Sequence, residues 1–211
     1  MNKKRINDFI NSYKNNNSKL YYLKQFANFT NVPIIKDDTE DFIKLILSIH
    51  RPKKILEIGA AIGYSSLMMS SILSDSHITT IENDEIRVKF AKENIKKYNS
   101  AKKIKLVFED ATTYLKKINN KKFDFIFLDA AKGQYYKWFN DIYPLMKKNS
   151  ILIADNIFKE YEILESLYTI KKRERTIHNN MRKFLYVITH NKNLYTSIFN
   201  IGDGISVSIR V

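Results

Sequence analysis

The chain of 211 residues has no cysteine, only three prolines and five glycines, and no long apolar run. The absence of cysteine excludes a disulfide framework and any thiolate metal site. Its apolar runs are far shorter than the roughly 20 residues that a membrane span needs, and its first residues lack the apolar core of a signal peptide. We therefore expect a protein without membrane segments that works in the cytoplasm.

Acidic residues are few as well. Lysine and arginine together number 36 against 22 aspartates and glutamates, which gives a formal net charge of +14. Such a surface attracts phosphates and favours a nucleic-acid partner. However, the 29 lysines far outnumber the 7 arginines, and the chain is crowded with Asn, Ile, Tyr and Phe. An AT-rich genome produces the same usage without selection for binding, so the charge alone leaves both explanations open.

The chain divides into a helical arm, residues 1–31, and one domain, residues 32–211. In the arm, Asn15–Asn17 separate two short helical patterns. In the domain, strands are expected over 54–58, 78–82, 104–108, 123–128, 150–154, 195–199 and 205–211. Helices are expected over 37–51, 63–73, 85–99, around 114, and over 135–147 and 176–190. The first of these helices has a cluster of N-cap candidates at 37–39. This alternation predicts an α/β fold with a doubly wound, mostly parallel seven-stranded sheet. The short connection 202–204 makes the last two strands an antiparallel hairpin.

Two of the apolar runs end in oxygen-bearing side chains. Ile126–Leu128 is followed by Asp129, and Ile151–Ala154 by Asp155 and Asn156. Each run suits a parallel strand covered on both faces, so these side chains should emerge at the strand carboxyl ends, where open α/β sheets bind ligands. Carboxylate and amide oxygens suit Mg²⁺, and we predict a magnesium site. The alternative is that each motif is only a helix cap or a loop acid.

The first strand leads into the turn Glu57-Ile-Gly59-Ala-Ala-Ile-Gly63-Tyr-Ser65, where glycines let a ligand approach the backbone closely. The glycine spacing differs from that of a dinucleotide or phosphate-binding loop. Glu82 ends the second strand, where an acid accepts hydrogen bonds from ribose hydroxyls, or it is a solvated turn acid. Asp110 and Ala111 follow the third strand, placed to meet an adenine edge, and Asp110 is also a candidate N-cap.

These residues together resemble class I S-adenosylmethionine O-methyltransferases of the catechol and caffeoyl-CoA type, from about Val32 to the end of the chain. The motifs that carry the resemblance are Glu57-x-Gly59-x3-Gly63-Tyr64-Ser65, Glu82, Asp110-Ala111, Asp129-x2-Lys132 and Asp155-Asn156. Within that family, Val32-Pro33, Arg182-Lys183-Phe184 and Gly202-Asp203-Gly204-Ile205 resemble the bacterial tRNA 5-hydroxyuridine O-methyltransferases.

The resemblance implies a Rossmann-like methyltransferase that binds S-adenosylmethionine and Mg²⁺, and a homodimer. It assigns the cofactor site to Ile35, Glu57, Gly59, Ser65, Glu82, Asp110, Ala111 and Asp129, with Glu57, Gly59 and Ser65 on the methionine part. It assigns the metal to Asp129, Asp155 and Asn156, and it places Lys132, with Asp129, beside the reacting hydroxyl.

Methyl transfer from a sulfonium requires an ionised oxygen held in line with the methyl carbon, so positioning and charge stabilisation carry the rate. Mg²⁺ chelated by two neighbouring substrate oxygens does both. Lys132 then acts either as the base, if burial and the metal depress its pKa, or as a stabiliser of the oxyanion.

Catechol and 5-hydroxyuracil both offer such an oxygen pair, so two substrate classes follow. The first is wobble 5-hydroxyuridine in the tRNA anticodon stem-loop, with phosphates held by basic residues. An unpaired base could then stack on Tyr135, Tyr136 or Tyr161; the alternative is that these aromatic side chains only pack in the core. The basic residues are Lys3, Lys4, Arg5, Lys19, Lys24, Lys171, Lys172, Arg173, Arg175, Arg182 and Lys183. The second is a small catechol or phenylpropanoid. A cofactor-binding protein without catalysis is disfavoured, because every expected chemical position is occupied.

Overall fold

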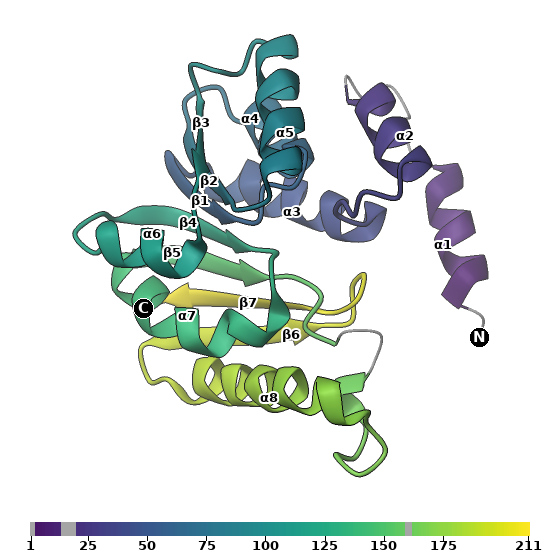
Figure 1. Cartoon of the computed structure of the whole chain (residues 1–211), viewed down its shortest axis with the longest axis vertical. Helices are drawn as coiled ribbons and strands as arrows, with labels where there is room; N and C mark the ends of the chain where they lie inside the picture. The colour runs from purple at the N-terminus through teal and green to yellow at the C-terminus, as the bar shows by residue number, and fades with distance from the viewer. Residues whose placement is uncertain (1–2, 14–19, 159–161) are drawn as a thin grey trace.

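A seven-stranded mixed sheet forms the centre of the protein in a computed structural model that describes residues 3–13, 20–158 and 162–211 (Figure 1). The strand order is β3-β2-β1-β4-β5-β7-β6, and the first five strands of the chain run parallel. The strands are β1 (Lys54–Ile58), β2 (His77–Glu82), β3 (Ile104–Phe108), β4 (Phe123–Leu128), β5 (Met146–Ala154), β6 (Leu194–Phe199) and β7 (Ile205–Arg210). This confirms the predicted fold class.

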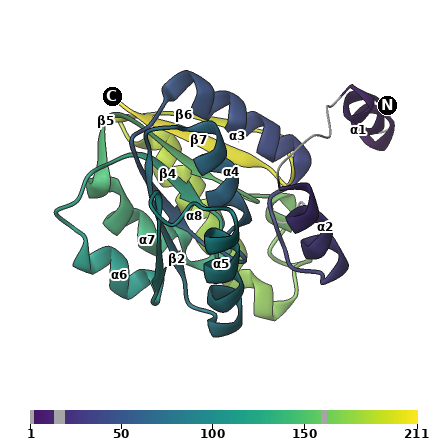
Figure 2. The same ribbon diagram turned by 90° about the horizontal axis from the view of Figure 1, so that it is seen from above.

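Helices cover both faces of the sheet, as Figures 1 and 2 show. The helices are α1 (Lys3–Ser12), α2 (Tyr21–Phe29), α3 (Asp37–His50), α4 (Tyr64–Ile72), α5 (Glu85–Lys97), α6 (Ala111–Lys117), α7 (Tyr135–Ile142) and α8 (Arg175–His190). Four short 3₁₀ helices, η1 (Lys132–Gln134), η2 (Tyr143–Leu145), η3 (Glu162–Leu164) and η4 (Lys172–Glu174), lie in the connections.

The apolar run at the end of β4 reflects the burial of the sheet on both faces. Successive strand side chains point to opposite faces, so Phe125 and Phe127 join the core shared with α3 and α4. Ile126 and Leu128 join the core shared with α6, α7 and α8. All four side chains are inaccessible to solvent. A polar residue between Phe125 and Leu128 would face a helix on either side, which is why this part of the strand is apolar.

The order of the sheet reverses between β1 and β4. β1 is followed in the chain by β2 on one side, whereas β4 pairs with it on the other, with Ile58 opposite Leu128. Connections leave such a point in opposite directions and open a crevice beyond the strand carboxyl ends. The Gly59 turn and Asp129 therefore begin side by side at this crevice.

The predicted C-terminal hairpin is confirmed. β6 and β7 pair antiparallel, with Phe199 opposite Ile205, and β7 also pairs antiparallel with β5. The hairpin thus closes the β5 side of the sheet, and its turn comes close to the segment that follows β5.

Two details of the predicted elements are wrong. The helix expected over 135–147 ends at Ile142, and β5 already begins at Met146, opposite Phe123. Pro144 lies between them in η2, and its missing N–H removes a helical hydrogen bond. The N-cap cluster expected at 37–39 lies inside α3, whose N-cap residue is Lys36, so its acids stand in the first helical turn.

The second half of the predicted arm contributes to the core. Leu23 and Ala27 of α2 are buried, and Phe26 packs on Phe90 of α5 with ring centroids 5.8 Å apart. α1 lies farther out from the sheet (Figures 1 and 2). The division after residue 31 stays a prediction. Among the described residues, no helix is both long and apolar enough to cross a bilayer.

Candidate active site

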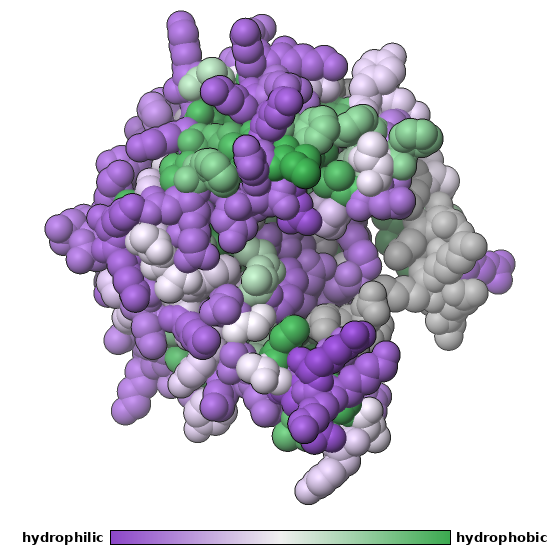
Figure 3. All heavy atoms as spheres, in the orientation of Figure 1, coloured by the Kyte–Doolittle hydropathy of each residue, from purple (hydrophilic) through white to green (hydrophobic). Residues whose placement is uncertain are grey.

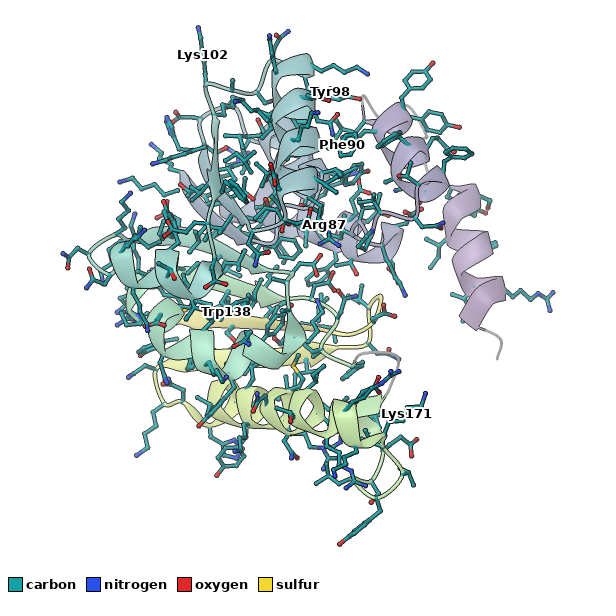
Figure 4. The ribbon with its side chains drawn as sticks, viewed as in Figure 1. Arg87, Phe90, Tyr98, Lys102, Trp138 and Lys171 are labelled. Carbon is teal, nitrogen blue, oxygen red and sulfur yellow. The ribbon has the colours of Figure 1, made fainter. Side chains whose placement is uncertain are left out.

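A cavity of about 640 Å³ lies at the carboxyl ends of the strands where the sheet order reverses. Its volume is in the range of small-molecule sites. The predicted residues that line it are Ile35, Gly59, Ser65, Glu82, Asp110, Ala111, Asp129, Lys132 and Asn156. Arg87 at the start of α5 and Trp138 of α7 also line it and are labelled in Figure 4. The topology therefore gathers almost the whole predicted site around one hollow.

Gly59 fixes the contact between the first turn and β4. Its φ is +103°, and a Cβ atom there would lie 2.0 Å from the carbonyl oxygen of Asp129. Only glycine combines this backbone conformation with so close an approach. The neighbouring Gly63 also has a positive φ, but a Cβ there would meet Ala91 at an ordinary 3.5 Å.

Glu57 lies beneath this turn and not on the cavity wall. Its side chain is completely buried and accepts hydrogen bonds from the hydroxyls of Ser66 and Thr80, the latter at 2.5 Å. Burial raises the pKa of Glu57 above its ordinary value. Its predicted contact with the cofactor stays a prediction; in this structure its visible role is to support the turn from below.

Glu82 reaches from the end of β2 into the cavity and braces the same turn. One carboxylate oxygen accepts the backbone N–H of Ala61 at 2.8 Å, and the other accepts those of Asn83 and Asp84 at 2.9 and 3.1 Å. The residue is only 7% exposed, so the alternative of a solvated turn acid is wrong. A buried carboxylate on the wall of a cavity is suited to accept ribose hydroxyls.

Asp110 is the N-cap of α6, as predicted, and its contact with the adenine stays a prediction. Its Oδ1 atom accepts the N–H groups of Thr112 and Thr113 and so caps α6. Asp110 and Ala111 also line the cavity, where Trp138 donates its indole N–H to the hydroxyl of Thr112 at 3.0 Å. The cap holds this wall rigid because it satisfies the first free N–H groups of the helix.

Lys132 brings two of the three predicted metal ligands together. Its Nζ atom lies 2.8 Å from Oδ1 of Asp129 and 3.0 Å from Oδ1 of Asn156. It also donates to the hydroxyl of Tyr135 at 3.0 Å. Burial alone would lower the pKa of Lys132, but Tyr135 and Asp129 raise it above the ordinary lysine value. The group is therefore an ammonium cation held between two acceptor oxygens.

Asp155 stands next to this cluster but deeper. It is 2% exposed, and its Oδ1 accepts the backbone N–H of Asn156 at 2.7 Å. Burial, together with the charge of Asp129, raises the pKa of Asp155 to about 7. The residue is absent from the cavity lining, so the structure brings Asp129 and Asn156 to the cavity itself and leaves Asp155 behind them.

These residues fit a hard divalent cation through their oxygen chemistry. Asp129 and Asn156 already direct oxygens toward the positive charge of Lys132. The described part of the chain contains no group of three or more His, Cys, Asp or Glu side chains suited to a metal. A divalent ion here would therefore depend on the amide oxygen of Asn156 as well as on carboxylates, a mixed oxygen set that Mg²⁺ accepts.

Two residues near the cluster have roles that the sequence did not reveal. Tyr135 is fully buried, and its hydroxyl lies within hydrogen-bond distance of the carbonyls of Leu128 and Asp155, at 3.0 and 3.2 Å, which ties the ends of β4 and β5 together. The prediction that Tyr135 stacks on a base is therefore wrong. Asp203, in the turn between β6 and β7, contacts Asn156; its only sequence signal is the pair of flanking glycines.

The predicted basic surface is only partly assembled. Lys24 is held by Asp37 and Glu40 at 2.5 and 3.0 Å, so it is committed to ion pairs within the chain. The side chains of Lys171, Lys172, Arg173 and Arg175 are exposed at the start of α8, where Figure 4 labels Lys171. Lys19 and Tyr161, and the side chains of Lys3 and Lys4, lie outside the described residues. Figure 3 shows hydrophilic side chains across much of this face of the molecule.

Comparison with known proteins places the chain clearly. The family model described as O-methyltransferase matches residues 13–211. A crystal structure of a proposed caffeoyl-CoA O-methyltransferase from Staphylococcus aureus is 32% identical and superposes with a TM-score of 0.89 over 97% of this chain and 98% of that one.

Two further proteins extend the comparison. A caffeoyl-CoA O-methyltransferase from Populus kitakamiensis is 25% identical over 201 residues, which cover 89% of this chain and 82% of that protein. The fold also matches an O-methyltransferase from Bacillus cereus in complex with SAH, at 23% identity and a TM-score of 0.86, over 98% of this chain and 97% of that one.

Proposed function

The chain belongs to the O-methyltransferase family, and from this premise we propose that it transfers a methyl group from S-adenosylmethionine to one hydroxyl of a small catechol-like substrate, with a divalent ion such as Mg²⁺. The observation that carries the proposal is the convergence of Asp129 and Asn156 oxygens on the ammonium group of Lys132 beside the cavity, because the same oxygens could hold a divalent ion. Two neighbouring substrate hydroxyls would be natural ligands of such an ion.

The cavity supplies groups for each part of the cofactor. Glu82 would accept the ribose hydroxyls, Asp110 and Ala111 would border the adenine, and Gly59 and Ser65 would face the methionine part, with Ile35 closing over it. The relative in complex with SAH has the same fold, which supports a cofactor of this type. When bound, the cofactor supplies an electrophilic methyl group on a sulfonium sulfur.

The metal would be held by Asp129, Asp155 and Asn156. When bound, it would lower the pKa of a chelated hydroxyl and fix its direction. Asp155 suits this role because it is buried beside Asp129, where two carboxylates need a positive charge between them.

Lys132 would hold charge at the reacting oxygen. In the transfer the substrate oxygen forms a bond to the methyl carbon as the bond from carbon to sulfur breaks, and the hydroxyl proton leaves to solvent. Against the effect of burial, Tyr135 and Asp129 raise the pKa of Lys132, and the ammonium form would stabilise the oxyanion.

The choice of a small aromatic substrate rests on the relatives. Two of the relatives described above carry the name caffeoyl-CoA O-methyltransferase, and a caffeoyl group presents two neighbouring hydroxyls.

A second candidate substrate is 5-hydroxyuridine at the wobble position of tRNA. The exposed basic residues Lys171, Lys172, Arg173 and Arg175 at the start of α8 favour it, as does the net charge of +14. The O5 and O4 atoms of 5-hydroxyuracil form the same kind of chelating pair as catechol.

A direct comparison of substrates tests both candidates. Purified protein with S-adenosylmethionine and Mg²⁺ is offered catechol, caffeic acid, caffeoyl-CoA, and an anticodon stem-loop that carries either 5-hydroxyuridine or uridine. The main proposal expects O-methylated catechol or caffeoyl products by mass spectrometry and no reaction on either stem-loop. Methylation of the 5-hydroxyuridine stem-loop alone would replace it with the tRNA candidate.

A further inference from the structure

The turn between β6 and β7 is clamped against two other parts of the chain. Gly202 and Gly204 have φ values of +59° and +85°, and a Cβ atom on either would lie 2.3 Å from Thr39 or Phe158, respectively. The N–H of Gly202 donates to Asp38, and the carbonyl of Gly204 accepts the N–H of Ile157. The residue between these glycines therefore has a fixed position beside the segment that follows β5.

That residue, Asp203, contacts both Asn156 and Lys36. Its Oδ2 accepts the Nδ2 group of Asn156 at 3.2 Å, and its Oδ1 accepts Nζ of Lys36 at 2.5 Å. Its main-chain carbonyl accepts the N–H of Phe158 at 2.9 Å. The side chain is only 23% exposed, so the contact with Asn156 is partly shielded from water.

The chemistry of the two side chains makes this contact directional. An ionised aspartate only accepts hydrogen bonds, whereas a carboxamide has one end that donates and one that accepts. Asp203 therefore selects the orientation in which Nδ2 of Asn156 points toward it and Oδ1 points toward Lys132, 3.0 Å away. The opposite orientation would place two N–H donors at the cation site and an oxygen against a carboxylate.

We propose that Asp203 is a positioning residue that orients the carboxamide of Asn156, so that its oxygen and not its nitrogen faces the cation site. This inference rests on the proposed divalent ion. Asp203 is not among the residues that line the cavity; it acts through Asn156. Lys36 balances the charge of Asp203 from the solvent side, and at 54% exposed it makes only a weak tie.

The test measures binding of Mn²⁺, a paramagnetic substitute for Mg²⁺, by electron paramagnetic resonance of the free ion. Residues that hydrogen-bond to a metal ligand typically contribute 10-fold to 100-fold to metal affinity. We therefore expect Asp203→Ala to weaken the binding of Mn²⁺ by about that factor. Asp203→Asn keeps an oxygen that accepts from Asn156 and should restore affinity to within about 3-fold of the wild type. Lys36→Met, the matched control, should also stay within about 3-fold.

A second set of variants starts from Asn156→Asp, in which the side chain at position 156 no longer has to be oriented. In Asn156→Asp the side chain carries two equivalent oxygens, so adding Asp203→Ala should not weaken Mn²⁺ further. Equal affinity in Asp203→Ala and the wild type, or an equal loss in both backgrounds, would overturn the positioning role. Absence of Mn²⁺ binding in the wild type would instead overturn the proposed metal site, on which the positioning role depends. Calorimetric affinity for S-adenosylmethionine reports on folding of the single Asp203 and Lys36 variants and should not change.

Discussion

The ammonium group of Lys132 lies 3.0 Å from the Oδ1 atom of Asn156, although the two residues follow different strands of the sheet. The same group lies 2.8 Å from Asp129. The two acceptor oxygens around this ammonium group form a site at the cavity wall that favours positive charge. The proposed metal, the oxyanion stabiliser and the orientation of Asn156 all depend on this arrangement.

Removal of the divalent ion should abolish methyl transfer. A bound metal contributes several kcal/mol of transition-state stabilisation, so we expect rates in excess chelator, and in Asp155→Ala with Mg²⁺, to fall by roughly 100-fold or more. Product formation is measured by mass spectrometry, and Mg²⁺ added back in excess should restore the wild type only. Undiminished turnover in chelator would contradict the metal-dependent mechanism.

Substitution of Lys132 should lower the rate of transfer more than it lowers cofactor affinity. Lys132→Met removes the charge beside the reacting oxygen, and the loss of one such electrostatic contact costs about 100-fold or more in kcat. S-adenosylmethionine affinity by calorimetry serves as the internal control. A variant that keeps its kcat would remove Lys132 from the chemistry.

Glu82→Ala should weaken S-adenosylmethionine binding. The carboxylate holds the backbone N–H groups of Ala61 and Asn83 and faces the cavity, so both the turn and the ribose contact are lost. Hydrogen bonds to a charged group contribute about 1.5–3 kcal/mol each, which predicts at least a 10-fold increase in Kd. Glu93→Gln, an exposed change on α5, is the control, and equal affinities in the two variants would disprove the assignment.

The two glycines of the first turn should respond differently to alanine. Both Gly59 and Gly63 have positive φ, so each substitution costs on the order of 1–3 kcal/mol of stability. Only at Gly59 must the carbonyl of Asp129 also move, because the new Cβ would lie 2.0 Å from it. Thermal unfolding and calorimetry should therefore show a larger loss of stability and cofactor binding in Gly59→Ala. Equal losses would show that the close approach is unimportant.

Glu40 should make stability depend on pH in the acid range. Burial alone would raise the pKa of Glu40, but ion pairs with Lys44 and Lys24 lower it below the ordinary value of 4.5. A depressed pKa means that the ionised group stabilises the fold above about pH 4.5 and that this contribution is lost as the pH falls through the lower, folded value. The difference in melting temperature between the wild type and Glu40→Gln should shrink from pH 7 to pH 3; a constant difference would exclude the linkage.

The fold could be predicted from the sequence because its signals are local and repeated. The apolar runs of β4 and β5 suit strands covered on both faces, and the helical patterns between the strands require parallel crossovers. The positions of Glu82, Asp110, Asp129 and Asn156 at strand ends follow from the same pattern, since parallel strands bring their carboxyl ends to one edge. The family could be identified from these motifs for that reason.

Tertiary packing alone decided the roles of residues with ambiguous local signals. For Tyr135 the sequence left base stacking and core packing open; the side chain is buried, and its hydroxyl meets the carbonyls that end two neighbouring strands. Asp203 looked like an ordinary turn residue, yet the antiparallel hairpin places it against the amide of Asn156, which is 47 positions away in the chain. Sequence determined which oxygens reach the edge of the sheet. Only the packed structure determined which way they point, because orientation depends on partners that are distant in the chain.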